Sequence, residues 1–184
     1  VMNVCRVAYF ELWCINSIRN LLSVDAVKTL VCSLVLSRLD YCNSLLVGLP
    51  QYLIKRLQGV QNAAARSILR TPRSEHISPL LQNLHWLPVN RRTLHKVTAL
   101  CHTSLSGSGP QYLSDLTHVY TPARSLRSSS DTRILSTSDV KLKSYGQCSF
   151  AYHGPFTWNS LPLALRYQQE SDCFKWVYVF SELM

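Results

Sequence analysis

Apolar residues recur every three to four positions along most of the chain, which is the period of an amphipathic α-helix. The first such pattern runs to about Arg19. A second starts at Ala26, behind the capping residue Ser23, and continues to about Val47, where Gly48 follows. Because apolar positions surround most of the second pattern, we predict a central and mostly buried helix there.

Two later helices are predicted to carry an apolar face and a cationic face. The first lies between Pro50 and Pro72, since proline suits the first turn of a helix and stops its continuation. The second covers about 90–105. On the polar sides of these two helices lie Lys55, Gly59, Asn62, Arg66 and Arg70, and Arg91, Arg92, His95, Lys96 and His102, respectively.

The remaining elements are predicted to be short. Ser78 and Pro79 open a small helix, and Pro110 opens another. The segments 134–136 and 140–142 could form short strands. The list is completed by a helix over 150–161 broken at Gly154 and Pro155, and by a terminal helix from Ser171. The pattern therefore predicts a mainly α fold with a few short strands.

The 184 residues suffice for one compact domain or for two small subdomains that share a core. Residues 121–133 are rich in Ser and Arg, which is typical of a solvated linker. We therefore expect four segments, namely 1–48, a basic helical region at 49–120, the linker at 121–133, and a small C-terminal segment at 134–184.

The charge is strongly basic and unevenly placed. Nineteen Lys and Arg stand against ten Asp and Glu, and thirteen of the cations are Arg. Eight cations and only one acid, Glu75, lie within 51–100. A polyanion is therefore the first partner to consider. The candidate phosphate contacts are Lys55, Arg66, Arg70, Arg73, Arg91, Arg92 and Lys96, and Gly59 would let a nucleic-acid backbone approach.

An equally good interpretation is that these cations form the ordinary solvated faces of amphipathic helices. Trp86 and Trp158 could stack on bases, but their contexts, LHWLP and TWNSLP, favour core packing.

The sequence offers little for catalysis. Two-metal nucleotidyl transfer needs paired carboxylates, and all ten acids here are isolated. No Gly-rich phosphate loop and no G-x-S-x-G motif is present. A zinc site from Cys101, His102, His118 and Cys148 would lack the usual paired spacing, so we expect Cys101 in the core and His102 on a polar face. We expect no enzyme activity, no cofactor or metal, and no small-molecule substrate.

The seven cysteines are scattered without a C-x-x-C motif, which favours reduced thiols in an intracellular protein, nuclear or cytoplasmic. The best apolar run, 29–37, is about half as long as a membrane span requires. We therefore expect no membrane contact.

Five consecutive blocks resemble, in order and spacing, the C-terminal region of LINE-type, non-LTR retrotransposon reverse transcriptases. The similarity covers nearly the whole chain. The blocks are INSIRNLLSVDAVKTLVCSLVLSRLDYCNSLLVGLP, LIKRLQGVQNAAARSILRT, HISPLLQNLHWLPVNRR, YLSDLTHVYTPARSLRSSS and WNSLPLALR.

The resemblance implies that residues 1–48 form a helical thumb, which packs against the template-primer duplex, and that the rest forms a helical extension. It implies contact with RNA or an RNA/DNA hybrid, and with the polymerase palm as a further partner. It assigns no catalytic residue to this chain, because the catalytic aspartates of the family lie upstream of this region. At Gly59 the sequence departs from the family, which commonly has a cation there. The alternative is a decayed remnant that acts as a structural or protein-interaction module.

Overall fold

The computed structural model describes residues 1–122, 133–142 and 146–167. Within these ranges the fold is mainly α, as predicted, and the only extended pairing is an antiparallel bridge between Val119 and Leu135. The contacts divide the chain into a first unit, Val1–Arg92, and a second unit, Thr93–Met184, and each is described by itself. This division differs from the predicted boundary at residue 48. Most of the linker predicted at 121–133, and the helix predicted from Ser171, lie outside the described residues.

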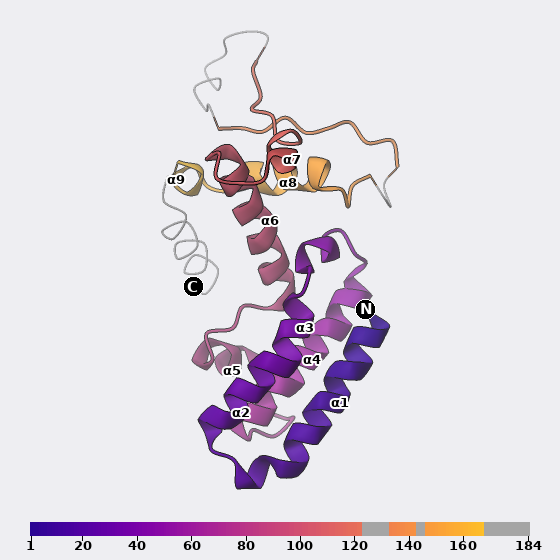
Figure 1. The fold of residues 1–184 in the computed structure, drawn as a ribbon, viewed down its shortest axis with the longest axis vertical. Coiled ribbons are helices and arrows are strands. Elements are labelled where there is room, and N and C mark those ends of the chain that lie inside the picture. The colour runs from indigo at the N-terminus through magenta and orange to yellow at the C-terminus, as the bar shows by residue number, and fades with distance from the viewer. Residues whose placement is uncertain (123–132, 143–145, 168–184) are drawn as a thin grey trace. The chain divides into compact units, whose positions relative to one another are not determined.

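The first unit is a bundle of helices (Figure 1). The elements, in chain order, are α1 (Met2–Ile18), the 3-10 turn η1 (Arg19–Leu21), α2 (Val24–Leu30), the π-helical segment η2 (Val31–Leu36), α3 (Ser37–Asp40), the 3-10 turn η3 (Asn43–Leu46), α4 (Gln51–Leu69) and α5 (Ile77–Asn83). The helix α6 (Val89–Leu105) begins within this unit. The predicted ends of α1 and α4 are confirmed. Helix α1 stops at Ile18, next to Arg19, and helix α4 stops at Leu69, before Pro72.

The predicted continuous helix from Ala26 to Val47 is wrong in its second half. Ser23 caps α2 as predicted, since its side chain accepts a hydrogen bond from the Ala26 amide. The helix nevertheless widens to a π-helix at η2 and ends at Asp40, because Tyr41 is extended and Cys42 is left-handed, with φ of 51°. In this irregular segment, the Ser33 hydroxyl donates to the Leu30 carbonyl and the Ser37 hydroxyl donates to the Ser33 carbonyl. Such bonds to carbonyls one turn back loosen a helix.

This second helical stretch is buried on one side only. Val27, Val31 and Val35 are almost fully buried in the core of the first unit. Lys28, Ser33 and Leu34 are exposed. The prediction of a mostly buried central helix is therefore wrong, and the stretch is amphipathic like its neighbours.

Small residues bring α1 and α4 close together in this core. Ala8 of α1 and Val60 and Ala64 of α4 are completely buried. The polar Gln61 is buried beside them because its amide donates to the Leu87 carbonyl at 2.8 Å. Trp86 is 6% exposed, which confirms its predicted place in the core.

The second unit is built around Trp158. It contains most of α6, then α7 (Gln111–Ser114), α8 (Phe150–Asn159) and α9 (Leu163–Arg166). The Trp158 side chain is fully buried against Cys101 and Leu135, and its indole nitrogen donates to the Arg133 carbonyl at 2.8 Å. The adjacent Asn159 exchanges two hydrogen bonds with the backbone of Leu135.

Two predictions about the second unit are wrong. The helix at 150–161 is not broken at Gly154 and Pro155, because α8 continues through both. Both residues are buried, and a Cβ at Gly154 would lie 3.1 Å from the Cys101 sulfur, so close packing holds this turn in place. Of the two predicted strands, 134–136 contributes only the Leu135 bridge, and residues 140–142 form none.

Candidate nucleic-acid interface

The helices α1 and α4 run in the same direction within the first unit (Figure 1). A basic groove lies along the seam between them. Three contacts fix this alignment. Arg56 Nη1 lies 2.7 Å from Met2 Sδ, and the Ser67 hydroxyl donates to Asn16 Oδ1 at 2.6 Å. Between these two points, a Cβ at Gly59 would lie 3.2 Å from the Tyr9 hydroxyl. Residue numbers thus rise together along the two helices.

One end of this groove is a hollow of about 750 Å³, which we call the amino-terminal hollow. Its cations are Arg6 from α1 and Lys55 and Arg56 from α4, and no carboxylate from the described part of the chain lines it. Cys5 lies on its floor. Burial raises the pKa of the Cys5 thiol, and the positive charges of the amino terminus and Arg56 oppose that rise.

The other end is a hollow of about 790 Å³, which we call the arginine hollow. Its cations are Arg19, Arg66 and Arg73, and again the described residues place no carboxylate in its lining. Asn16 and Thr71 add polar side chains. The two hollows share Tyr9 and Gly59, so a single basic groove follows the α1–α4 seam.

Gly59 has a different role from the predicted one. The space that its missing side chain leaves is taken by the Tyr9 hydroxyl. Burial raises the pKa of Tyr9, and the charge of Arg73 opposes this rise, so the phenol is close to the arginine hollow. Gly59 therefore leaves room for the Tyr9 hydroxyl at the place that the two hollows share.

The seven residues predicted from the sequence fall into three groups. Lys55, Arg66 and Arg73 line the groove, and Arg70 lies at the end of α4, close enough for its charge to lower the pKa of Arg19. Arg66 is half-buried rather than exposed, because its guanidinium donates to the Glu75 carbonyl at 3.0 Å. Arg91, Arg92 and Lys96 line neither hollow.

Arg92 has a structural partner within the first unit. Its Nη1 lies 2.9 Å from a carboxylate oxygen of Asp40, just where α3 ends. Burial raises the pKa of Asp40, and the charge of Arg92 and a hydrogen bond from Asn43 oppose that rise. We therefore remove Arg92 from the candidate phosphate contacts. Arg91 and Lys96 are exposed, and Lys96 belongs to the second unit.

Sequence reasoning missed three groove cations: Arg6, Arg19 and Arg56. Arg56 follows Lys55 directly, and Arg19 stands where α1 ends, but neither position has a pattern that marks it as functional. Only the pairing of α1 with α4 gathers these residues with Lys55 and Arg66. A helical wheel treats one helix at a time and cannot show this.

No group of three or more Cys, His, Asp or Glu in the described part of the chain could hold a metal ion. Cys101 lies in the core as predicted, and burial raises the pKa of its thiol to about 12. His102 is not on a polar face, as we had expected. It is 4% exposed, and its ring centroid lies 6.3 Å from that of Trp158.

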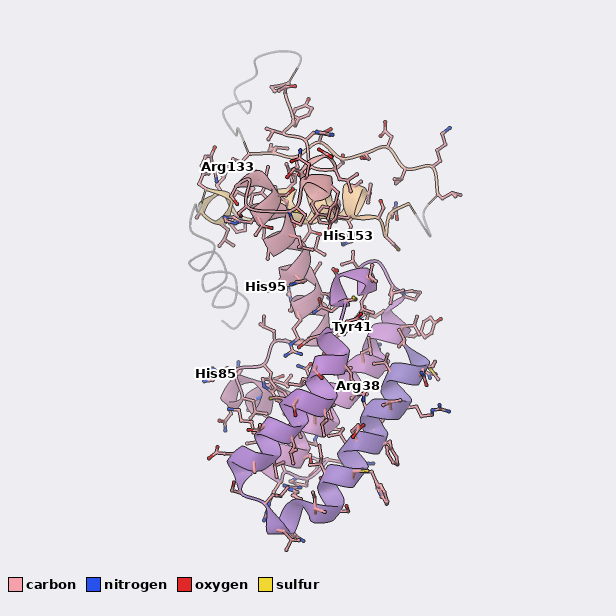
Figure 2. All side chains as sticks on the ribbon, viewed as in Figure 1. Arg38, Tyr41, His85, His95, Arg133 and His153 are labelled. Carbon is pink, nitrogen blue, oxygen red and sulfur yellow. The ribbon has the colours of Figure 1, made fainter. Side chains whose placement is uncertain are left out.

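Apolar side chains are also exposed on the first unit. Phe10 and Trp13 stack on the outer side of α1, with 60% and 67% of their surfaces exposed. Arg38 and Tyr41, labelled in Figure 2, line a further groove between α1 and the η2–α3 stretch. None of the described helices has the length and the apolar character needed to cross a membrane.

No family model, no curated protein and no solved structure matches this chain. The resemblance to LINE-type reverse transcriptases is therefore a prediction from the sequence blocks alone.

Proposed function

We propose that this chain is the non-catalytic thumb and post-thumb part of a retrotransposon RNA-directed DNA polymerase, and that it binds the phosphate backbone of RNA or an RNA/DNA hybrid along the α1–α4 groove. The observation that carries the proposal is the lining of the two hollows, where six Lys and Arg gather and the described residues supply no carboxylate. Such a surface attracts phosphates without reading bases.

The length of the groove suits a short stretch of nucleic acid. Lys55 and Arg66 are eleven residues apart on one helix, which corresponds to about 16 Å along its axis. At a rise of about 3.4 Å per nucleotide, this distance spans roughly five phosphates of one strand. About four to six phosphate contacts would make log affinity fall with log salt at a slope of roughly −3 to −5.

A fluorescence-anisotropy titration with a short RNA and an RNA/DNA hybrid, repeated at several salt concentrations, tests the interface. In the variant Lys55→Gln/Arg56→Gln, two contacts are lost from the amino-terminal hollow. We expect a slope about 1.4 shallower for the single strand, at roughly 0.7 per contact, and a similar loss of affinity for every sequence.

The matched control is Lys28→Gln/Arg38→Gln, which removes the same charge from exposed positions outside the groove. Its slope should stay close to that of the unmodified chain, because distant charges are screened within about 10 Å at 0.1 M salt. Equal slopes for the two double variants, with both folded, would show that the groove cations are only a solvated surface.

The proposal also implies that the isolated chain incorporates no nucleotides. Its sequence contains no Asp-Asp pair and no D-x-D motif, and two metals cannot be held in line with a primer end by single carboxylates. Metal-dependent primer extension that persists through purification, and that follows the protein in every column fraction, would contradict this part of the proposal.

A second function, a decayed remnant acting as a protein-interaction module, is favoured by the exposed Phe10–Trp13 pair. Exposed aromatic pairs are enriched where proteins associate. Under this alternative, Phe10→Ser/Trp13→Ser would abolish a concentration-dependent association seen by analytical ultracentrifugation, while RNA affinity would be negligible before and after the change.

A further inference from the structure

The arginine hollow contains polar groups that the chain itself leaves unsatisfied. Arg19 Nη2, Arg66 Nε and Thr71 Oγ1 are each shielded from solvent, and none has a hydrogen-bond partner among the described residues. All three side chains line the same hollow. Polar groups shielded in this way are rare in folded proteins, and a charged one is costly.

The described residues supply no compensating charge around this hollow. Arg19, Arg66 and Arg73 line it without an acid from that part of the chain, and Arg70 adds a fourth cation nearby. Burial lowers the pKa of the Arg19 guanidinium, and the charge of Arg70 lowers it further. An arrangement of like charges in a partly dry site is stabilised when an anion joins it.

The donors fit a tetrahedral oxyanion. Guanidinium groups donate in a planar fork that matches phosphate, and a hydroxyl can supply one further donor. The guanidinium groups and the Thr71 hydroxyl come from three segments, η1, α4 and the turn after α4, so they can approach one anion from different sides.

We propose that the arginine hollow is a phosphate-binding pocket, in which Arg19, Arg66 and Thr71 donate to one phosphate group and Arg73 adds its charge. Two sources could supply this group: a phosphate of a nucleic acid or free orthophosphate. For a nucleic-acid phosphate the inference rests on the proposed function. For orthophosphate it does not.

The test begins with isothermal titration calorimetry of the full chain with orthophosphate, at constant ionic strength kept by chloride. We expect saturable binding with one site. Arg19→Gln should weaken it at least tenfold, because a charge-assisted hydrogen bond is lost. Thr71→Val keeps the shape of the side chain and should weaken binding about threefold to tenfold. Lys28→Gln, with the same charge change far from the hollow, should bind as the unmodified chain does.

Folding does not confound this test. Arg19→Gln removes a shielded group without a partner, so circular dichroism and the melting temperature should be unchanged or slightly raised. If that variant nevertheless unfolds, Thr71→Val carries the comparison. Equal phosphate affinity in the unmodified chain, a folded Arg19→Gln and Thr71→Val would overturn the pocket, and so would the lack of any saturable binding.

The second arm identifies the source with two RNA oligonucleotides that differ only in a 5′-phosphate. Tighter binding of the phosphorylated oligonucleotide, lost in Arg19→Gln, would support a terminal phosphate as the ligand. Equal binding of both, with competition by orthophosphate, would support an internal phosphodiester.

The two proposals fail separately. Saturable orthophosphate binding without any RNA binding would support the pocket with free phosphate as its ligand and contradict the proposed function. RNA binding with the expected salt slope, unaffected by Arg19→Gln and by orthophosphate, would support the proposed function and overturn the pocket.

Discussion

Arginine side chains have different surroundings in the two units of this protein. In the second unit, Arg166 is 8% exposed, its Nε donates to the Leu161 carbonyl at 3.1 Å, and its own carbonyl accepts from Arg133 Nη1 at 2.8 Å. In the first unit, Arg19 and Arg66 are half-buried, and each keeps one shielded nitrogen without a partner among the described residues. A satisfied buried arginine serves the fold, whereas an unsatisfied one beside a hollow is poised for an external ligand.

The two units differ in packing as well. Trp158 fills the core of the second unit completely, and a Cβ at Gly154 would meet the buried Cys101 sulfur. In the first unit, a Cβ at Gly59 would meet only the far end of the Tyr9 side chain. The comparison therefore predicts that equivalent substitutions will have unequal effects in the two units.

The largest expected effect is on Trp158. Replacing it by alanine should cost about 3–5 kcal/mol, because a large buried ring is removed and a cavity remains. The same change at Trp13, which is 67% exposed, should alter stability by less than about 0.5 kcal/mol. Urea unfolding followed by circular dichroism measures the loss.

Cys101 reports on the second unit specifically. Its thiol is fully buried with a pKa of about 12, so it should react with a thiol reagent only when this unit opens. Trp158→Ala should speed that reaction strongly. Equal Cys101 labelling rates in the Trp158 and Trp13 variants would contradict the prediction that Trp158 holds this unit closed.

The next effect compares the arginines directly. Arg166→Met should destabilise the protein by about 2–3 kcal/mol, since the Leu161 carbonyl loses a charged donor in a buried site. Arg19→Met should leave the melting temperature unchanged or raise it, because the shielded Arg19 nitrogen has no described partner to lose. Thermal unfolding in a phosphate-free buffer makes this comparison. A loss as large for Arg19 as for Arg166 would remove the distinction between them.

A smaller effect is expected at the two helical glycines. Gly154→Ala should cost about 1 kcal/mol, because overpacking against Cys101 outweighs the gain in helix propensity. Gly59→Ala should stabilise the protein by up to about 1 kcal/mol, since the Tyr9 hydroxyl can move away. If both substitutions shifted the urea midpoint in the same direction, Gly154 and Gly59 would not differ in how tightly their surroundings are packed.

The smallest effect concerns pH. Burial lowers the pKa of His153, which packs against Phe156 in α8, so the unfolded chain binds a proton more readily than the folded one. Stability should therefore fall as the pH drops below about 6.5, the ordinary value for histidine. His153→Gln should flatten this dependence, and His118→Gln, at an exposed position, should not. Chemical unfolding at a series of pH values between 7.5 and 5 provides the measurement.

The sequence by itself determined most of the helices. The apolar period predicted α1, α4, α6 and the mainly α class, and proline and serine marked where helices begin or end. It also determined that the charge gathers in 51–100, and it identified Lys55, Arg66 and Arg73, which do line the groove. Local periodicity carries this information because each signal depends on neighbours within one or two turns.

Only the tertiary structure decided which residues each helix face contacts. Arg92 forms an ion pair with Asp40 and is therefore not a candidate phosphate contact. The pairing of α1 with α4 adds Arg6, Arg19 and Arg56 to the candidate interface. Burial beside Trp158 likewise moves His102 from a predicted polar face into the second unit's interior. These outcomes depend on contacts between residues 50 to 56 positions apart. A periodic pattern within one helix contains no information about which distant segment will cover it.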